Sequence, residues 1–273
     1  MEINRSNISE IVNKASLKPD KDYGQNFLIE PVISEKIVAA LNLEKDDCVL
    51  EVGPGLGSLT HFISMNNVKC DAVDIDRRMI DFLKVIYQYN ANLSIIENDI
   101  RKQSVAGYNK IIGNLPYNIT TESIQYFLLN AKNAKKMVFM IQNEALNRFY
   151  DISGKEYGPV SVLLHLIGDI NKLFTVKAGS FYPVPKCSSV VFVINVDNHT
   201  SREEATNVFA LAKQLFLNRR KTIQNNLSNI IKDKGFVQKL CEDLSINPLA
   251  RPEDLFPETY LEIYRYINKH SSK

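Results

Sequence analysis

Short apolar runs alternate with amphipathic stretches along residues 48–142. The apolar runs are CVLEV, CDAVDI, LSIIEN, KIIGN and MVFMIQ, and stretches with helical periodicity such as LGSLTHFISM and TESIQYFLLNA separate them. This alternation is typical of βαβ units, in which each helix returns the chain to a neighbouring parallel strand. The pattern therefore predicts an α/β fold built on a largely parallel sheet.

The pattern changes in the last part of the chain. KLFTVKAG and SSVVFVINV indicate two strands joined by the proline-rich SFYPVPK, which favours an antiparallel pair at the sheet edge. From about residue 200 the periodicity is helical, as in EEATNVFALAKQLFL and PETYLEIYRYI. We expect an α/β domain with an N-terminal arm over residues 1–199 and a small helical domain over residues 200–273.

Composition allows a large core and narrows the choice of chemistry. The chain has 273 residues, of which 45% are hydrophobic, and a net charge of only +2. It has no apolar run of 18 residues and no signal-peptide centre near its N-terminus, so we expect a cytoplasmic protein without a membrane span. The cysteines form no CxxC pair, and no metal site is expected.

The segment VLEVGPGLGSLT places Gly53, Gly55 and Gly57 between a strand and a helical stretch. A glycine-rich turn in this context approaches a nucleotide-like ligand. The dinucleotide-binding pattern needs its third glycine at position 58, which is serine here. A nicotinamide-dependent oxidoreductase is therefore only the second interpretation of this turn.

Three successive predicted strands each end in an acid, namely Glu51, Asp74 and Asp99. Carboxyl ends of parallel strands share one edge of a sheet, where ligands of this architecture bind. Asp74 is placed to accept the hydroxyl protons of a ribose, although Asp76 competes for that role. A row of carboxylates without a phosphate-binding lysine favours a cationic ligand, and S-adenosylmethionine, with its sulfonium, ammonium and adenosine, fits it.

The next strand end reads GNLPYNIT and contains an amide, a proline and an aromatic ring in succession. Asn114 and the carbonyl of Leu115 are suited to accept the hydrogens of an exocyclic amine, while Tyr117 is suited to stack on the ring that bears it. Methyl transfer to such an amine needs alignment more than a general base. The alternative is that this segment is only a strand-to-helix connection.

Residues 205–232 contain no acid but include Arg219, Arg220 and Lys221 in succession. A basic segment of this kind is suited to contact the phosphates of a nucleic acid. The alternative is an ordinary solvated helix surface.

Taken in order, several segments resemble the rRNA adenine N6,N6-dimethyltransferase family: YGQNFL, LEVGPGLGSLT, VDID, NDI, NLPYNIT, MIQNEALNR, YGPVSVLL, FYPVPKCSSVVF and NRRKTIQNNL. The resemblance covers most of residues 23–260, and INPLARPEDL is similar to the tail of the bacterial small-subunit enzymes. It implies a Rossmann-like class I methyltransferase sheet with a small C-terminal helical domain. It also implies S-adenosylmethionine as cofactor and, as substrate, two adjacent adenines near the 3′ end of small-subunit rRNA in an immature subunit.

The resemblance also implies the roles of individual residues. Tyr117 and Phe181 would sandwich the target adenine, although core packing is the alternative for Phe181. Arg219, Arg220 and Lys221 would contact RNA, and a monomer without metal is expected. The cofactor site would be lined by Asn26, Leu28, Gly53, Asp74, Asp99 and Asn114, to which the glycine turn and the acid row add Gly55 and Glu51.

The chain departs from the family pattern in two places. Asp22 and Tyr23 replace a usual Ser-Leu pair, and Asn143 stands where a lysine is common. These changes bear on affinity for RNA and leave the reaction type unaffected. Three alternatives remain: a macrolide-resistance methyltransferase that acts on large-subunit rRNA, a nicotinamide-dependent oxidoreductase, and a non-catalytic RNA-binding or assembly factor. The intact cofactor motifs argue against the last of these.

Overall fold

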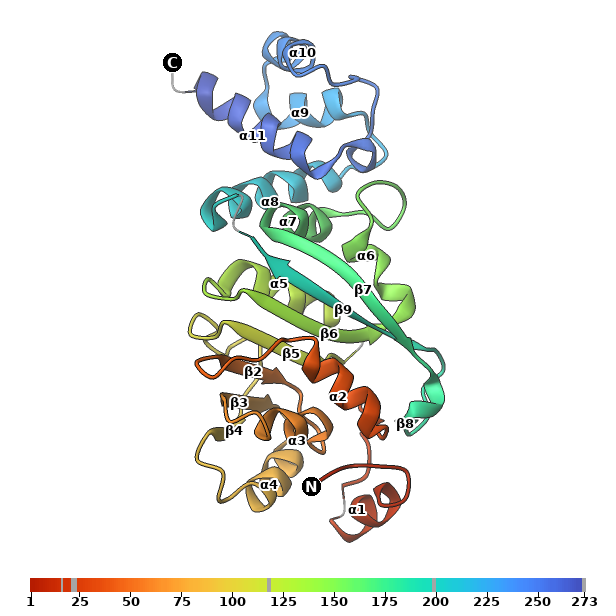
Figure 1. The fold of residues 1–273 in the computed structure, drawn as a ribbon. Helices are drawn as coiled ribbons and strands as arrows, with labels where there is room; N and C mark the ends of the chain where they lie inside the picture. The colour runs from red at the N-terminus through yellow and green to blue at the C-terminus, as the bar shows by residue number, and fades with distance from the viewer. Residues whose placement is uncertain (16, 21–23, 117–118, 198–199, 272–273) are drawn as a thin grey trace. The chain divides into compact units, whose positions relative to one another are not determined.

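A computed structural model describes residues 1–15, 17–20, 24–116, 119–197 and 200–271. The chain forms two compact units, coloured by residue number in Figure 1. The first comprises Met1–Leu146 and Asn171–Val196, and the second comprises Asn147–Ile170 and Asp197–Lys273. One of the points where the chain passes between units lies close to the boundary expected near residue 200. The sequence did not indicate that residues 147–170 also belong with the helical part.

The first unit is built on a seven-stranded sheet with the order β4-β3-β2-β5-β6-β9-β7. Neighbouring strands from β4 to β6 pair in parallel, and β9 is antiparallel to β6. The predicted largely parallel α/β sheet is confirmed, and so is the adjacency of the last two strands at its edge. The strands are β2 (Cys48–Val52), β3 (Lys69–Asp74), β4 (Leu93–Glu97), β5 (Lys110–Asn114), β6 (Lys136–Gln142), β7 (Gly168–Val176) and β9 (Ser189–Val196).

The strand order reverses between β2 and β5. From β2 the chain moves outward to β3 and β4 and then crosses back, so that β5 pairs with β2 on its other side. Connections leave such a reversal point in opposite directions and open a crevice at the carboxyl ends of the strands. This topology places the binding crevice beside Val52 and Gly113, which are partners in the register.

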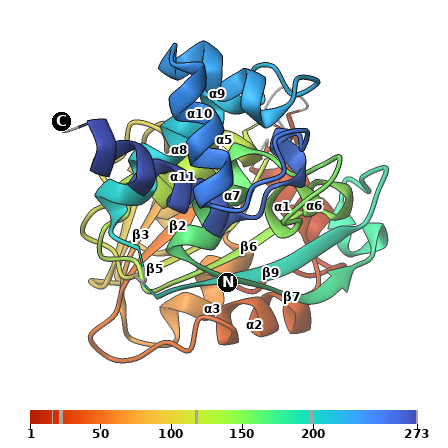
Figure 2. The same ribbon diagram turned by 90° about the horizontal axis from the view of Figure 1, so that it is seen from above.

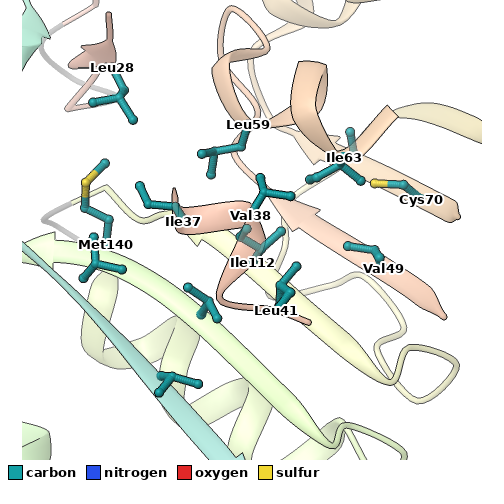
Figure 3. Packing of buried hydrophobic residues seen from close by; sticks show 14 of the residues in the cluster. Leu28, Ile37, Val38, Leu41, Val49, Leu59, Ile63, Cys70, Ile112 and Met140 are labelled. Carbon is teal, nitrogen blue, oxygen red and sulfur yellow. The ribbon is translucent and has the colours of Figure 1, made fainter. Parts of the chain in front are cut away.

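Helices cover both faces of this sheet. Figures 1 and 2 show α2 and α3 on one face, and Figure 3 shows Ile37, Val38 and Leu41 packed with the side chains of Val49 and Ile112. On the other face the ring of Phe127 in α5 stacks on the ring of Phe139 in β6, with the ring centroids 5.6 Å apart. The helices are α1 (Ile8–Lys14), α2 (Pro31–Ala39), α3 (Ser58–Ser64), α4 (Arg77–Ile86), α5 (Thr120–Asn130), η1 (Asn143–Ala145) and η2 (Ala178–Ser180).

A second, two-stranded sheet ties the N-terminal arm to the loop before β9. β1 (Phe27–Leu28) pairs antiparallel with β8 (Phe181–Tyr182), and Leu28 lies opposite Phe181. The N–H of Ile29 extends the pairing by donating to the carbonyl of Ser180 at 2.9 Å. Local periodicity did not predict this pairing, because it joins two very short segments far apart in the chain.

The second unit is helical and has its own aromatic core. The ring of Phe216 lies between the rings of Tyr157 and Tyr260, at centroid distances of 5.7 and 6.1 Å. The side chain of Ser201 caps α8, and Arg265 binds Glu204 at 2.7 Å. Its elements are α6 (Asn147–Tyr150), α7 (Pro159–Ile167), α8 (Arg202–Phe216), α9 (Ile223–Ile231), α10 (Lys234–Asp243), η3 (Pro252–Asp254) and α11 (Pro257–Ser271).

Candidate active site

A cavity of about 320 Å³ opens at the carboxyl ends of β2 to β5 in the first unit. The glycine turn after β2 and the N-terminal segment 24–28 complete its wall. Most residues that the sequence singled out for the cofactor and the amine meet here, although they come from four strands and the arm. These lining residues are Asn26, Leu28, Glu51, Gly53, Gly55, Asp74, Asp99, Asn114 and Leu115.

The glycine turn needs glycine for two different reasons. The φ angles of Gly53, Gly55 and Gly57 are 64°, 54° and 89°, all in the left-handed region that other residues rarely adopt. At position 57 a Cβ atom would also lie 2.8 Å from Cδ2 of Leu83 in α4. The third glycine, which comes one position earlier than in a dinucleotide-binding turn, therefore serves the close packing of α4 against the turn.

Asp74 and Asp76 have different surroundings, which separates the two candidates for a ribose ligand. Asp74 lines the cavity and accepts hydrogen bonds from the N–H groups of Gly55 at 3.2 Å and Asp76 at 2.9 Å. Burial raises the pKa of Asp74 even though these donors act in the opposite direction. The carboxylate is thus held at the cavity wall by the glycine turn itself.

Asp76 has a structural role instead. It is 4% exposed, caps α4 through the N–H of Arg78, and accepts a hydrogen bond from Nε2 of Gln25 at 2.8 Å. Burial acts to raise the pKa of Asp76, but the hydrogen bonds from Arg78 and Gln25 outweigh it and lower the pKa. Asp76 therefore fastens the N-terminal arm to the end of β3 and does not line the cavity.

Asp99 is held by an arginine that the sequence reasoning missed. Arg101 binds both oxygens of Asp99, at 3.0 Å through Nε and 2.8 Å through Nη2, and reaches Glu122 of α5 at 3.3 Å. These hydrogen bonds lower the pKa of Asp99 and keep it charged. Because Asp99 and Arg101 both line the cavity, this ion pair fixes the position of the carboxylate at the β4 end of the site.

Asn114 and Leu115 are fixed in different ways at the end of β5. Asn114 donates from Nδ2 to the carbonyl of Asn26 at 3.2 Å, which leaves Oδ1 as its acceptor. The N–H of Leu115 donates to the carbonyl of Met140 at 3.0 Å. Among the described residues no backbone N–H donates to the Leu115 carbonyl. Two acceptors are therefore available at one strand end.

Glu51 is the most deeply buried acid of the site. It is 1% exposed, and neither carboxyl oxygen has a hydrogen-bond partner within the described part of the chain. Burial raises the pKa of Glu51 to about 8 although Thr60 acts to lower it, and the nearby negative charge of Asp74 adds to the rise. At neutral pH this carboxyl group is mostly protonated.

The structure differs from the expectation for Phe181. Its side chain is 1% exposed, belongs to the hydrophobic cluster that contains Leu28, and does not line the cavity. The β1–β8 pairing draws this end of the proline-rich loop into the core, so the alternative of core packing describes it. Tyr117, its expected partner in stacking, lies outside the described residues, as do Asp22 and Tyr23.

Several lining residues carried no signal that marked them as site residues. Ile75 is an apolar side chain, 50% exposed, between two acids at the end of β3. An exposed apolar side chain beside a carboxylate suits the face of an aromatic ring, and the sequence DID was the only available sign. The other lining residues of this kind are Pro54, Asn98, Ile100, Arg101, Pro116 and Ile119.

The run of three cations at residues 219–221 lies between α8 and α9 of the helical unit, and its members are not equivalent. Arg219 is half-buried, donates to the carbonyl of Gly154 and pairs with Glu253 at 3.4 Å. Its guanidinium also lies 5.8 Å from the ring centre of Phe216. Arg219 is thus occupied within its own unit, whereas Arg220 and Lys221 are exposed.

The residues that the structure describes contain neither a cluster of metal ligands nor a membrane-spanning helix. No group of three or more histidine, cysteine or acidic side chains is arranged there to hold a metal ion. None of the helices in that part of the chain combines the length and apolar character that a membrane span requires.

The strand order, the glycine turn and the acid-lined cavity at the reversal point define the class I methyltransferase fold. Comparison with known proteins shows which family of class I methyltransferases the chain belongs to. The model of the ribosomal RNA adenine dimethylase family matches residues 16–269, and the chain belongs to this family.

Relatives support the same family over nearly the whole chain. A protein named ribosomal RNA small subunit methyltransferase A from Malacoplasma penetrans is 35% identical, over 92% of this chain and 93% of its own. One of the same name from Alkaliphilus metalliredigens is 34% identical over 97% of each chain. Among solved structures, a dimethyladenosine transferase from Plasmodium falciparum has a TM-score of 0.78 at 25% identity, covering 89% of this chain and 98% of that one. The 23S rRNA methyltransferase ErmE, at 20% identity and a TM-score of 0.70, shares the fold.

Proposed function

We propose that this protein transfers methyl groups from S-adenosylmethionine to N6 of two adjacent adenines near the 3′ end of small-subunit rRNA. Each adenine is methylated twice, and the substrate is an immature ribosomal subunit in the cytoplasm. The names of the Malacoplasma and Alkaliphilus relatives support the choice of small-subunit rRNA. In this proposal the α/β unit carries out the chemistry, and the helical unit recognises the RNA.

One observation carries the proposed reaction: the cavity that holds the acid row also holds Asn114. Its acceptor Oδ1 is set by the hydrogen bond from Nδ2 to Asn26, and the Leu115 carbonyl lies next to it in the chain. A pair of acceptors suits an exocyclic amine, which has two hydrogens to donate. No carboxylate is needed at this position, because methyl transfer to an amine depends mainly on alignment.

The cavity residues fit S-adenosylmethionine. Its volume of about 320 Å³ lies in the range of small-molecule sites. Asp74 would hold the ribose hydroxyls, Asp99 the amine of the cofactor's adenine, and Ile75 the face of that ring, while Asn26, Leu28, Gly53 and Gly55 complete the wall. When bound, the cofactor supplies a methyl group on a positively charged sulfur, which is an electrophile that needs no metal.

At the other end of the cavity the chain positions the target amine. Asn114 and Leu115 accept its hydrogens and direct the nitrogen lone pair toward the methyl group. Tyr117 would stack on the adenine, because base extraction costs a few kcal/mol and stacking returns about 1–3 kcal/mol per base. Phe181, buried behind Leu28, would support the wall in this arrangement.

The decisive experiment incubates the protein with immature small subunits, with large subunits and with labelled S-adenosylmethionine, and then analyses rRNA fragments by mass. We expect two adjacent dimethyladenosines in small-subunit rRNA and no label in large-subunit rRNA. Label in large-subunit rRNA instead would favour the macrolide-resistance alternative. Label in neither, with intact cofactor binding, would favour an assembly factor without catalysis.

Calorimetric titration is expected to detect binding of S-adenosylmethionine and not of NAD. The acid row repels a pyrophosphate, and the third glycine is displaced from the dinucleotide-binding position. Heat from NAD alone would overturn the cofactor assignment.

Asp74→Ala is expected to weaken the affinity for S-adenosylmethionine by about 10- to 100-fold, because hydrogen bonds to a charged group are lost. Asp76→Ala serves as the comparison, since it removes a helix cap and should mainly lower the melting temperature, by an amount equivalent to about 1 kcal/mol. Titration and thermal melts of both variants measure the two effects. If Asp76→Ala loses the affinity and Asp74→Ala keeps it, the ribose assignment moves to Asp76.

A double variant of Arg220 and Lys221 to Ala is expected to reduce affinity for immature small subunits and to flatten its dependence on salt. Two lost phosphate contacts lower the log–log slope by about 1.4–1.8. The matched control replaces the exposed Lys234 and Lys239 of the same unit. Arg219→Ala should instead lower the melting temperature, because its ion pair with Glu253 is structural. An unchanged slope in the double variant would remove this segment from the RNA interface.

A further inference from the structure

Glu51 is an acid whose burial is only weakly compensated: the hydroxyl and N–H of Thr60 lie near it and act to lower its pKa, but neither forms a hydrogen bond of normal geometry with its oxygens. Both of its oxygens lack hydrogen-bond partners, and its exposed fraction is 1%, yet it lines the cavity. A buried ionised carboxylate without donors is strongly unfavourable, so such a group stays neutral until a cation or a set of donors arrives. A ligand that binds in this cavity can supply that cation or those donors.

We propose that cofactor binding expels the proton of Glu51, whose carboxylate then pairs with the ammonium group of the cofactor's amino-acid end. The inference rests on the proposed function, because it takes S-adenosylmethionine as the ligand. The O–H bond of the carboxyl group breaks, its proton passes to the buffer, and the ammonium keeps its own protons. No oxidation or further reactant is involved.

The ammonium is a better partner than the sulfonium because of what Glu51 lacks. Two unsatisfied oxygens need N–H or O–H donors, and an ammonium supplies three whereas a sulfonium supplies none. The strand order agrees with this choice. In the proposed site Asp99, which follows β4, and Asp74 on β3 take the adenosine, and β2 with Glu51 follows on the side toward β5. The amino-acid end of the cofactor would then lie over β2.

Of the other titratable groups around Glu51, only Asp74 could also release a proton when the ligand binds. From β3 come Asp74 and the thiol of Cys70, whose pKa burial raises well above its usual value. From the end of α4 comes the hydroxyl of Tyr87, whose pKa burial also raises. The Cys70 thiol and the Tyr87 hydroxyl therefore stay protonated near neutral pH, with and without ligand. From α3 comes Thr60, which does not titrate, so only Asp74 competes as a proton source.

The pH dependence follows from the direction of the shift. Burial raises the pKa of Glu51 to about 8 in the free protein, and the ammonium lowers it in the complex. Cofactor affinity should therefore rise with pH below about 8, by up to tenfold per pH unit where the free carboxyl group is protonated and the bound one is not. At higher pH the affinity should fall again, because the amino group of the free cofactor loses its own proton.

Calorimetric titration at pH 7 in two buffers with different ionisation enthalpies counts the protons released. We expect the full-length protein to release close to one proton with S-adenosylmethionine and with S-adenosylhomocysteine, which shares the ammonium but lacks the sulfonium. Glu51→Gln should release none and should lose the pH dependence of its affinity. Asp74→Asn, although it binds more weakly, should still release the proton.

The proton-release experiment has a matched control and three outcomes that contradict different parts of the proposal. Glu97→Gln changes an exposed acid at the end of β4 and should behave as the wild type. Release with S-adenosylmethionine but not S-adenosylhomocysteine would overturn the ammonium assignment. Binding of both without release would overturn the coupling. Failure of S-adenosylmethionine to bind would instead overturn the proposed function.

A measurement without ligand tests the same carboxyl group. A raised pKa in the folded state gives stability that is fully present below the ordinary value of 4.5 and is lost progressively as pH rises to about 8. Glu51→Gln keeps a neutral side chain at every pH. Its melting temperature should therefore exceed that of the wild type by an amount that grows with pH up to about 8 and is constant above it, and a difference that does not change with pH would contradict a neutral Glu51.

Discussion

An Asn114→Ala variant is expected to lose methyl transfer by on the order of 10²-fold or more, the effect of removing one polar group aligned with a transition state. Its affinity for S-adenosylmethionine and for immature small subunits should stay close to that of the wild type, because the acid row and the helical unit are unchanged. Single-turnover transfer of a labelled methyl group measures the chemistry, and separate titrations measure binding. Wild-type turnover would refute the proposed amine receptor.

Asn114→Asp separates the two parts of this side chain. An aspartate keeps an acceptor for the amine but loses the N–H that Asn114 donates to the Asn26 carbonyl at 3.2 Å. The substitution also brings a carboxylate oxygen against the Asn26 carbonyl oxygen, and two acceptors cannot form a hydrogen bond with each other. If the hydrogen bond to Asn26 matters for alignment, Asn114→Asp should lose much of the turnover although its acceptor is still present. Full activity would mean that the acceptor alone is sufficient.

The sheet and the acid row were predictable because both follow from local patterns. Each strand is a short apolar run between turn residues, and the carboxyl ends of parallel strands meet at one edge whatever the details of packing. Glu51, Asp74 and Asp99 therefore reach one cavity, as the spacing predicted. The crevice between β2 and β5 also follows from the fold class, because a doubly wound βαβ sheet opens a crevice where its strand order reverses.

Other features depend on contacts between distant segments, which periodicity does not encode. An aromatic residue in a proline-rich loop is compatible with stacking or with core packing, and only the β1–β8 pairing puts Phe181 in the core. In the same way, Arg219 belongs to a basic run in the sequence, but Glu253 and Gly154 approach it from elsewhere in the chain. The inclusion of residues 147–170 in the helical unit has the same origin.

Environment is a second limit on what sequence can predict. Asp74 and Asp76 are two residues apart and chemically identical, yet one lines the cavity and the other caps a helix. The lack of a well-formed hydrogen bond to the Glu51 oxygens is likewise a property of the folded core. A sequence marks a carboxylate as a candidate, whereas its protonation state depends on neighbours that only folding brings together.

Gly113→Ala is expected to reduce both stability and methyl transfer, although position 113 touches no ligand in the proposed mechanism. A Cβ there would lie 2.7 Å from the carbonyl oxygen of Val52 and 3.0 Å from its Cβ, so β5 must move away from β2. Forcing an extra carbon into a packed interior costs about 1–3 kcal/mol. Because Asn114 follows directly, the shift also moves the amine acceptor, and a misplacement of about 1 Å can cost on the order of 10²-fold in rate.

The matched control for this variant is Gly107→Ala, because a Cβ at position 107 would meet no atom within 4 Å. Thermal melts and single-turnover assays should find Gly107→Ala equal to the wild type and Gly113→Ala impaired in both. Assays well below the melting temperature separate misalignment from unfolding, since a folded Gly113→Ala variant should still bind S-adenosylmethionine through Asp74 and Asp99. A variant with wild-type stability and turnover would mean that β2 and β5 can separate without moving Asn114, and the close strand contact would then have no part in positioning the site.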